Sequence, residues 1–218
     1  MKKSHGLLLA VILIIFNSCI GLSIDIQMNR DGSGKLLLEY RISRTIETLG
    51  ALDGNTSMPT IPIGREDWER SIERVRGARM TSFSSSKSGQ DTINKITVDF
   101  DNPKALLQVL DSPGESTSID MNNRIFKIIL KNDFLKSLNT EFDERLLDLA
   151  RMLFSDYKLA ISFSAPSNSS LTVTDVDGKE INPPARADVV STGRRVSISV
   201  GIIDLLDIPN GLGLRFNW

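Results

Sequence analysis

The stretch LSIDIQMNRDGSGKLLLEYRI, residues 22–42, decides the fold because it holds two alternating segments around a glycine-containing turn. Within 22–28 and again within 36–42, every even-numbered residue is apolar. A period of two is typical of a β-strand with one buried face. Gly32 and Gly34 lie between the segments, where we expect them to supply the positive φ angles of a tight turn. The stretch therefore predicts an antiparallel β-hairpin.

The same alternation extends over the rest of the chain. A second hairpin is predicted around the turn SKSGQD and a third around the pair Asn122-Asn123, because alternating segments flank both. Four more strands are predicted from alternation near the C-terminus. The predicted strand segments beyond the first hairpin are 79–86, 92–100, 118–121, 124–131, 157–163, 171–173, 196–200 and 212–218.

Helices are predicted between these strands. Residues 66–76 place Trp68 and Ile72 on one apolar face with charges opposite, and Gly77 stands where a helix would end. We expect Trp68 to be a core residue. Further helices are predicted at 44–50, at 103–110 behind Pro103, and at 140–154 behind a capping box of Thr140 and Asp143.

This order predicts an α+β fold with a mostly antiparallel sheet built from hairpins and with helices packed on one face. The reason is that short links cannot make the crossovers that parallel pairing requires. We expect residues 22–218 to form a single domain, with two small lobes as the alternative. Trp218 is expected to be the last inward residue of a closing strand; the alternative is an exposed tryptophan that reaches a partner or the membrane interface.

The beginning of the chain predicts export. Lys2 and Lys3 precede an apolar run over residues 6–16, which ends at Asn17-Ser18-Cys19. That run is about half of the roughly 20 residues that a membrane-spanning helix needs, so a signal peptide fits it better than a permanent span. Cys19 is the only cysteine of the chain.

The segment Phe16-Asn17-Ser18-Cys19 resembles the lipobox of bacterial lipoproteins, in the looser form seen in spirochaetes. The resemblance implies that residues 1–18 are a signal peptide, cleaved between Ser18 and Cys19. Residues 19–21 would then be a lipidated N-terminus whose thiol carries a diacylglycerol with palmitate-like chains. The location implied is the cell envelope, at the periplasmic face or the cell surface. An ordinary cleaved signal and an uncleaved anchor remain alternatives.

Composition restricts the chemistry. His5 is the only histidine and would leave with the signal peptide, so Ser-His-Asp triads and the common histidine-containing zinc sites are excluded from the mature chain. A formal net charge of −1, with acids and bases interspersed, argues against nucleic-acid binding. We expect no cofactor, no metal and no enzymatic activity.

Two short motifs have ordinary structural explanations. Ser84 and Lys87 fit the S-x-x-K pattern of penicillin-binding enzymes, but polar residues at the end of a β-arm are usually solvated. Residues 175–178 (DVDG) begin like a calcium loop, yet Lys179 and Arg186 occupy positions where that loop needs oxygen ligands. A hairpin turn explains DVDG better.

The opening hairpin with its DGSG turn, the segment around Pro166 and the late strands ending in Trp218 resemble lipoproteins of the mycobacterial LppM kind and related spirochaetal lipoproteins. The resemblance implies an envelope lipoprotein with a lipid-handling or binding role. We expect a non-catalytic scaffold or interaction module, bound to a membrane through Cys19. A carrier of lipid or another apolar ligand is the alternative. An envelope protein or a lipid is the expected partner, and the oligomeric state stays open.

Overall fold

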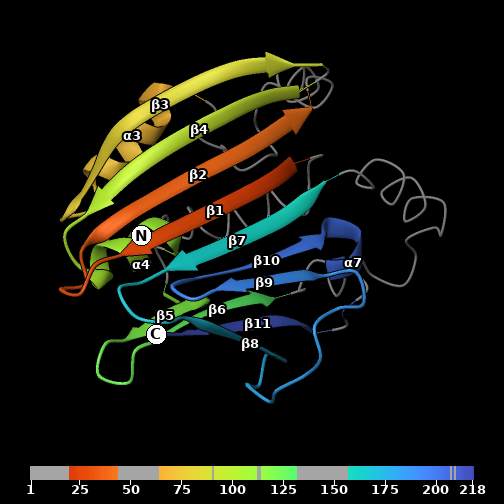
Figure 1. Ribbon diagram of the computed structural model, residues 1–218. Coiled ribbons are helices and arrows are strands. Elements are labelled where there is room, and N and C mark those ends of the chain that lie inside the picture. The colour runs from red at the N-terminus through yellow and green to blue at the C-terminus, as the bar shows by residue number, and fades with distance from the viewer. Residues whose placement is uncertain are drawn as a thin grey trace, which may run out of the picture.

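The computed structural model describes residues 20–43, 64–89, 91–111, 114–131, 157–206, 208 and 210–218, which form two β-sheets with three short helices (Figure 1). Three predicted features lie outside these residues: the signal peptide with the attachment site at Ser18 and Cys19, the helix at 44–50 and the helix at 140–154.

The larger sheet has seven strands in the order β3-β4-β2-β1-β7-β10-β9. The opening hairpin supplies β1 and β2, and the predicted second hairpin supplies β3 and β4. The edge strand β9 has no counterpart among the predicted strands, because both of its valines are exposed and no alternation marks it. The strands are β1 (Ile20–Met28), β2 (Gly34–Ser43), β3 (Ala78–Ser88), β4 (Asp91–Phe100), β7 (Lys158–Ser164), β9 (Asp188–Thr192) and β10 (Arg195–Gly201).

The smaller sheet has four strands in the order β5-β6-β11-β8, and each neighbouring pair is antiparallel. It lies below the larger sheet in Figure 1. The predicted third hairpin forms β5 and β6, while β8 and β11 come from the C-terminal quarter of the chain. The strands are β5 (Thr117–Asp120), β6 (Ile125–Lys131), β8 (Ser170–Thr174) and β11 (Gly211–Asn217).

Antiparallel pairing dominates, as predicted, with one exception. β1 pairs with β7 in parallel, and Leu22 lies opposite Leu159. The larger sheet is therefore mixed. The argument that short links exclude parallel pairing holds only for strands that follow each other in the sequence. β1 and β7 are far apart in the chain, so no short link restricts their direction.

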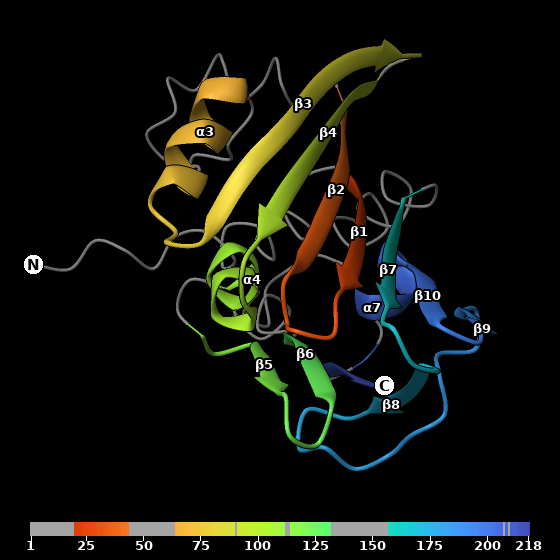
Figure 2. The same ribbon diagram turned by 60° about the vertical axis from the view of Figure 1, so that its left-hand side comes forward.

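The helices do not form a layer on one face, which corrects the second part of the fold prediction. α3 (Arg65–Glu73) contacts β3, and α4 (Pro103–Leu110) contacts β5, β3 and β4. α7 (Ile202–Leu206) was not predicted and contacts β10 and β11. Figure 2 shows α3 and α4 beside the β3–β4 side of the molecule and α7 behind β7. No helix in the described ranges has the length and hydrophobicity of a membrane span.

Glycine is required at the two positions of the opening turn, Gly32 and Gly34, for different structural reasons. Gly32 has a φ of 83°, the left-handed conformation that glycine adopts without strain. Gly34 does not have a positive φ, contrary to the prediction. A Cβ atom at Gly34 would instead overlap the carbonyl oxygen of Gln27 and the ring of Phe100. Glycine is required there because backbone and ring approach too closely for any side chain.

One face of the larger sheet is apolar and buried, and the other is polar. The buried residues of the two sheets, α3, α4 and α7 form one continuous hydrophobic cluster. Phe163 of β7 joins the sheets, because its ring centroid lies 5.8 Å from that of Phe126 on β6 and 5.6 Å from that of Phe216 on β11. All three rings are fully buried. These phenylalanines therefore hold the smaller sheet against the larger one.

Cross-strand ion pairs cover the polar face. Lys95 of β4 lies 2.9 Å from Glu39 of β2, and Arg195 of β10 lies 3.2 Å from Asp25 of β1. Their side chains are partly or largely exposed, so each pair contributes about 0–1 kcal/mol at most. The pairs keep this face polar and hydrated and help to select the strand register, but burial of the apolar face supplies most of the free energy of folding.

A buried polar pair joins α3 to the larger sheet. Trp68 is 3% exposed, which confirms its predicted place in the core, and its Nε1–H donates a hydrogen bond of 3.1 Å to the hydroxyl of Tyr40 on β2. Burial raises the pKa of Tyr40 to about 12; the hydrogen bond with Trp68 opposes this shift and the nearby Asp67 carboxylate reinforces it.

Replacing the ring that joins the sheets should destabilise the whole domain. We expect Phe163→Ala to lower the free energy of unfolding by about 3–5 kcal/mol, the usual cost of removing a fully buried aromatic ring. Urea unfolding followed by circular dichroism measures it. Val190→Ala, at a side chain 46% exposed, is the control and should change stability by less than about 0.5 kcal/mol. Similar losses in the two variants would contradict the assigned role of Phe163.

Alkaline pH should weaken the fold through Tyr40. The pKa of Tyr40 in the folded protein, about 12, lies above the unfolded value of 10.0. The stability that the neutral hydroxyl contributes to the folded state is therefore complete below pH 10 and is lost as pH rises toward 12. Thermal melts between pH 9 and pH 12 should therefore show a falling Tm. Tyr40→Phe should flatten that decline relative to the starting protein. An equally steep decline in the variant would show that another group is responsible.

Candidate functional site

The predicted lipid-attachment residues, Ser18 and Cys19, lie outside the described residues. Ile20, which follows Cys19 directly, already belongs to β1 and pairs with Ile42 of β2. The sheet therefore begins two residues earlier than the domain predicted from residue 22. Within the described part of the chain, no linker separates position 19 from the folded domain.

Ser84 and Lys87 do not form a nucleophile–base pair. Both lie on the edge strand β3, where Ser84 is opposite Lys95 and Lys87 is opposite Thr92 of β4. Residues three apart on a strand point to opposite faces. Both side chains are exposed, so nothing removes solvent from the serine hydroxyl or the lysine amine. The S-x-x-K pattern is a solvated β-arm, as the sequence indicated.

The DVDG segment is a tight turn between β8 and Glu180. The N–H of Asp175 donates to the carbonyl of Lys179 and the Asp175 carboxylate accepts from the N–H of Lys179, both at 2.8 Å. Gly178 has a φ of 89°, which suits a glycine turn. The described residues contain no group of three or more acidic, histidine or cysteine side chains placed to hold a metal ion.

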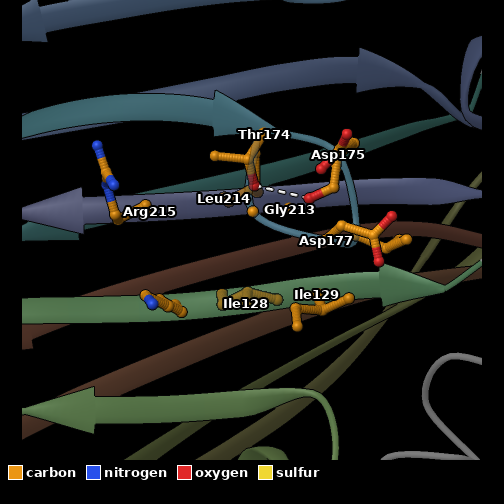
Figure 3. Close-up of a pocket in the computed structure, with 11 residues that line it drawn as sticks. Ile128, Ile129, Thr174, Asp175, Asp177, Gly213, Leu214 and Arg215 are labelled. Atoms are coloured by element: carbon orange, nitrogen blue, oxygen red, sulfur yellow. Dashed lines mark hydrogen bonds between the residues drawn. The ribbon is translucent and has the colours of Figure 1, made fainter. Parts of the chain in front are cut away.

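A small pocket lies between this turn and the smaller sheet (Figure 3). It is lined by Ile129, Asp177 and Arg215 among others, and its volume is about 160 Å³. Typical ligand pockets measure about 300–1,000 Å³, so this one suits a few waters rather than an organic ligand. Gly213 also lines this pocket, and a Cβ atom there would collide with Thr174 and the Asp175 carbonyl.

A buried amide interrupts the apolar face of the larger sheet. Asn94 of β4 is 1% exposed, and neither polar atom of its side chain makes a hydrogen bond. An unsatisfied buried amide costs about 1–3 kcal/mol. Asn94 lines neither this small pocket nor the larger pocket that is described next. It is an unusual core residue and has no assigned ligand.

A larger pocket, about 390 Å³, lies at the end of the sheet where β1 turns into β2. Its size falls within the range of small-molecule and peptide-side-chain sites. We call it the distal pocket, because it lies at the opposite end of β1 from Ile20, the first residue of the strand. Its lining residues are Arg30, Met121, Arg124, Pro166, Ser167 and Trp218.

Four separate segments build the distal pocket. The turn after β1 carries Arg30, the β5–β6 turn carries Met121 and Arg124, the β7–β8 loop carries Pro166, and Trp218 follows β11. These turns and the C-terminus lie toward the left of Figure 1. The convergence depends on the packing of the two sheets, because the first turn belongs to the larger sheet and the second to the smaller.

Trp218 is held in place from two sides. Its ring centroid lies 5.1 Å from that of Phe163, and its backbone N–H donates a hydrogen bond of 3.2 Å to the carbonyl of Arg124. Arg124 itself has a φ of 55°, an uncommon conformation for a residue other than glycine. Trp218 is half-buried but lies one residue beyond β11, so it is not itself a strand residue as predicted; its ring packs inward on Phe163 and also contributes to the pocket wall.

The two arginines of the pocket have no side-chain partner among the described residues. Six other described arginines make ion pairs with carboxylates; they are Arg41, Arg65, Arg70, Arg79, Arg186 and Arg195. Arg30 and Arg124 therefore present guanidinium groups whose hydrogen-bond donors are available to an external acceptor.

The acidic residues nearest in sequence are engaged in their own turns. Asp31 accepts hydrogen bonds from the hydroxyl and N–H of Ser33, at 2.7 Å and 3.0 Å. Asp120 accepts from the side-chain amide and N–H of Asn123, at 2.7 Å and 3.0 Å. These hydrogen bonds hold the pKa of both carboxyl groups below the ordinary value. Both carboxylates stabilise turns and leave the pocket arginines unpaired.

The groups that line the distal pocket are of the kinds that bind ligands. The pocket combines two cations, an aromatic ring, a thioether and one hydroxyl, Ser167, and no general base from the described residues accompanies that hydroxyl in the pocket lining. Sequence patterns did not identify Arg30 or Arg124, because an arginine in a polar turn is common. Arg30 and Arg124 differ from other arginines in polar turns because four segments of the chain bring them into one pocket.

Comparisons with known proteins found a structural neighbour but no sequence relative. No protein-family model matches the chain, and no curated protein matches it. Among solved structures, the chain is similar to the folded domain of the LppM protein of Mycobacterium tuberculosis, at 10% identity and a TM-score of 0.39. The match covers 84% of this chain and 90% of that domain.

Proposed function

We propose that this protein is a membrane-anchored envelope lipoprotein whose folded domain is a non-catalytic interaction module. The anchor is a lipid on Cys19, and the contact surface is the distal pocket. The observation that carries the proposal is the pair of unpaired arginines beside Trp218 in an open pocket of ligand-binding size.

The anchor is supported by the N-terminal sequence. Two lysines, an apolar run of 11 residues and a single cysteine follow each other in the order that a lipoprotein signal requires. A thiolate is the nucleophile that accepts the diacylglycerol, and two or more acyl chains make the attachment stable. An anchor of this kind needs no membrane-spanning helix.

The interaction role is supported by the composition of the distal pocket. Arginine and tryptophan are the residue types most enriched among the side chains that dominate binding energy at protein interfaces. Met121 adds an adaptable apolar surface and is 37% exposed. Histidine is absent after residue 5, which removes the commonest general base from any catalytic alternative.

Removing the thiol should abolish lipid attachment. We expect Cys19→Ala to reduce incorporation of radiolabelled palmitate to background and to release the protein from the membrane fraction, because a methyl group cannot accept the lipid. Ser18→Ala keeps a small residue before the cysteine and is the matched control, in which labelling should persist. Labelling retained in Cys19→Ala would disprove the anchor.

A partner should be within reach of the distal pocket in cells. We expect a photo-crosslinking amino acid at position 121 to give a discrete protein adduct in the envelope, whereas the same group at Lys179, an exposed turn residue outside the pocket lining, should not. Mass analysis of the adduct separates a protein partner from a lipid. Equal adducts at both positions, or none at 121, would contradict an interaction module centred on this pocket.

A further inference from the structure

We propose that the distal pocket binds an oxyanion, either a carboxylate or a phosphate, which a partner presents from the side facing away from the anchoring membrane. This inference rests on the proposed function and extends it in two respects. It names the chemical class of the bound group, and it states the direction from which that group arrives.

The two guanidinium groups indicate the chemical class of the ligand. A guanidinium is planar and offers paired N–H donors that match the two oxygens of a carboxylate or phosphate. Arg30 and Arg124 come from different turns and line the same pocket. With Asp31 and Asp120 engaged by Ser33 and Asn123, no described carboxylate satisfies these donors. An incoming oxyanion would supply the missing acceptors.

The other residues of the pocket wall indicate what kind of group carries the oxyanion. Trp218 presents an aromatic ring, and Met121 and Pro166 present apolar surface beside the cations. Such a wall favours an oxyanion that carries a flat or apolar group over a bare inorganic ion. Ser167 offers one hydroxyl for orientation. Inorganic phosphate should therefore bind more weakly than an acidic group on a larger body.

The direction follows from the junction between Cys19 and β1. Because Ile20 is already paired with β2, a lipid on Cys19 holds the beginning of the strand at the bilayer surface. β1 has 9 residues. At roughly 3.3 Å per residue the strand spans about 30 Å, which is the separation between the anchor and the turn that carries Arg30. The strand is the central one of the larger sheet, so this separation is rigid.

This separation disfavours the lipids of the anchoring bilayer as the source of the oxyanion. The pocket and the anchor lie at opposite ends of one strand, so headgroups stay distant from the arginines as long as β1 projects away from the bilayer, which the comparison of nanodiscs below tests. The oxyanion then belongs to a molecule beyond the domain.

The two tryptophans provide a test with an internal control. The full chain contains two, Trp68 and Trp218, and 5-fluorotryptophan labelling gives each a fluorine resonance. Trp68 is 3% exposed and bonded to Tyr40, so its resonance reports the integrity of the fold. Trp218 lines the pocket and reports binding. The protein is purified from membranes in detergent and titrated with inorganic phosphate or with an acetylated Glu-Glu peptide amide.

We expect saturable shifts of the Trp218 resonance with both probes, an unchanged Trp68 resonance, and tighter binding of the peptide. Arg30→Ala and Arg124→Ala should each weaken binding by about tenfold or more, the factor expected for losing a charge-assisted hydrogen bond. Arg186→Ala removes an exposed arginine outside the pocket lining and should leave binding unchanged. Shifts that sodium chloride reproduces, or that survive both pocket substitutions, would overturn the assigned ligand class.

Direction is tested by reconstituting the lipidated protein in nanodiscs. We expect the same Trp218 resonance in zwitterionic and in anionic discs, because the pocket does not reach the bilayer that holds it. A shift in anionic discs alone would overturn the assigned direction and identify lipid headgroups as the source. Failure of the anchor would appear separately, as loss of palmitate labelling, while the titration in detergent would still report on the pocket.

Discussion

The structure depends on the pairing of β1 on both of its edges. Along one edge it forms an antiparallel ladder with β2, and along the other a parallel ladder with β7. Backbone groups on both edges of a strand must find partners when the strand is buried, and β1 finds them in segments far apart in the sequence. This central strand joins β2, β4 and β3 on one side to β7, β10 and β9 on the other, so the other strands of the larger sheet take their positions from it.

Packing between the sheets follows from this arrangement. The parallel ladder places Phe163 opposite Ile26 on the buried face, and Phe163 then contacts Phe126 and Phe216 of the smaller sheet. The same ring supports Trp218, whose backbone is bonded to the turn carrying Arg124. The wall of the distal pocket is therefore continuous with the hydrophobic core, which makes the pocket a preformed feature of the fold.

The proposed anchor and pocket are connected by the same strand. A domain attached without a linker keeps one end of β1 close to the bilayer, so the lipid would limit how far the sheet can move from the membrane. Many interaction modules depend on flexible tethers to search for partners. Here a rigid strand would hold the pocket at a constant distance from the anchor, which favours a partner whose own position is also constrained.

The sequence by itself determined the hairpins, the two longer described helices and the inward face of most strands, because these depend on local alternation, turn glycines and capping residues. The parallel pair, the added strand β9, the helix α7 and the separate placement of the helices were decided by tertiary structure. Alternation shows which face of a strand is buried but not which strand lies beside it. Likewise, Arg30 and Arg124 form a common site only after the sheets pack, because that packing brings together turns that no local pattern connects.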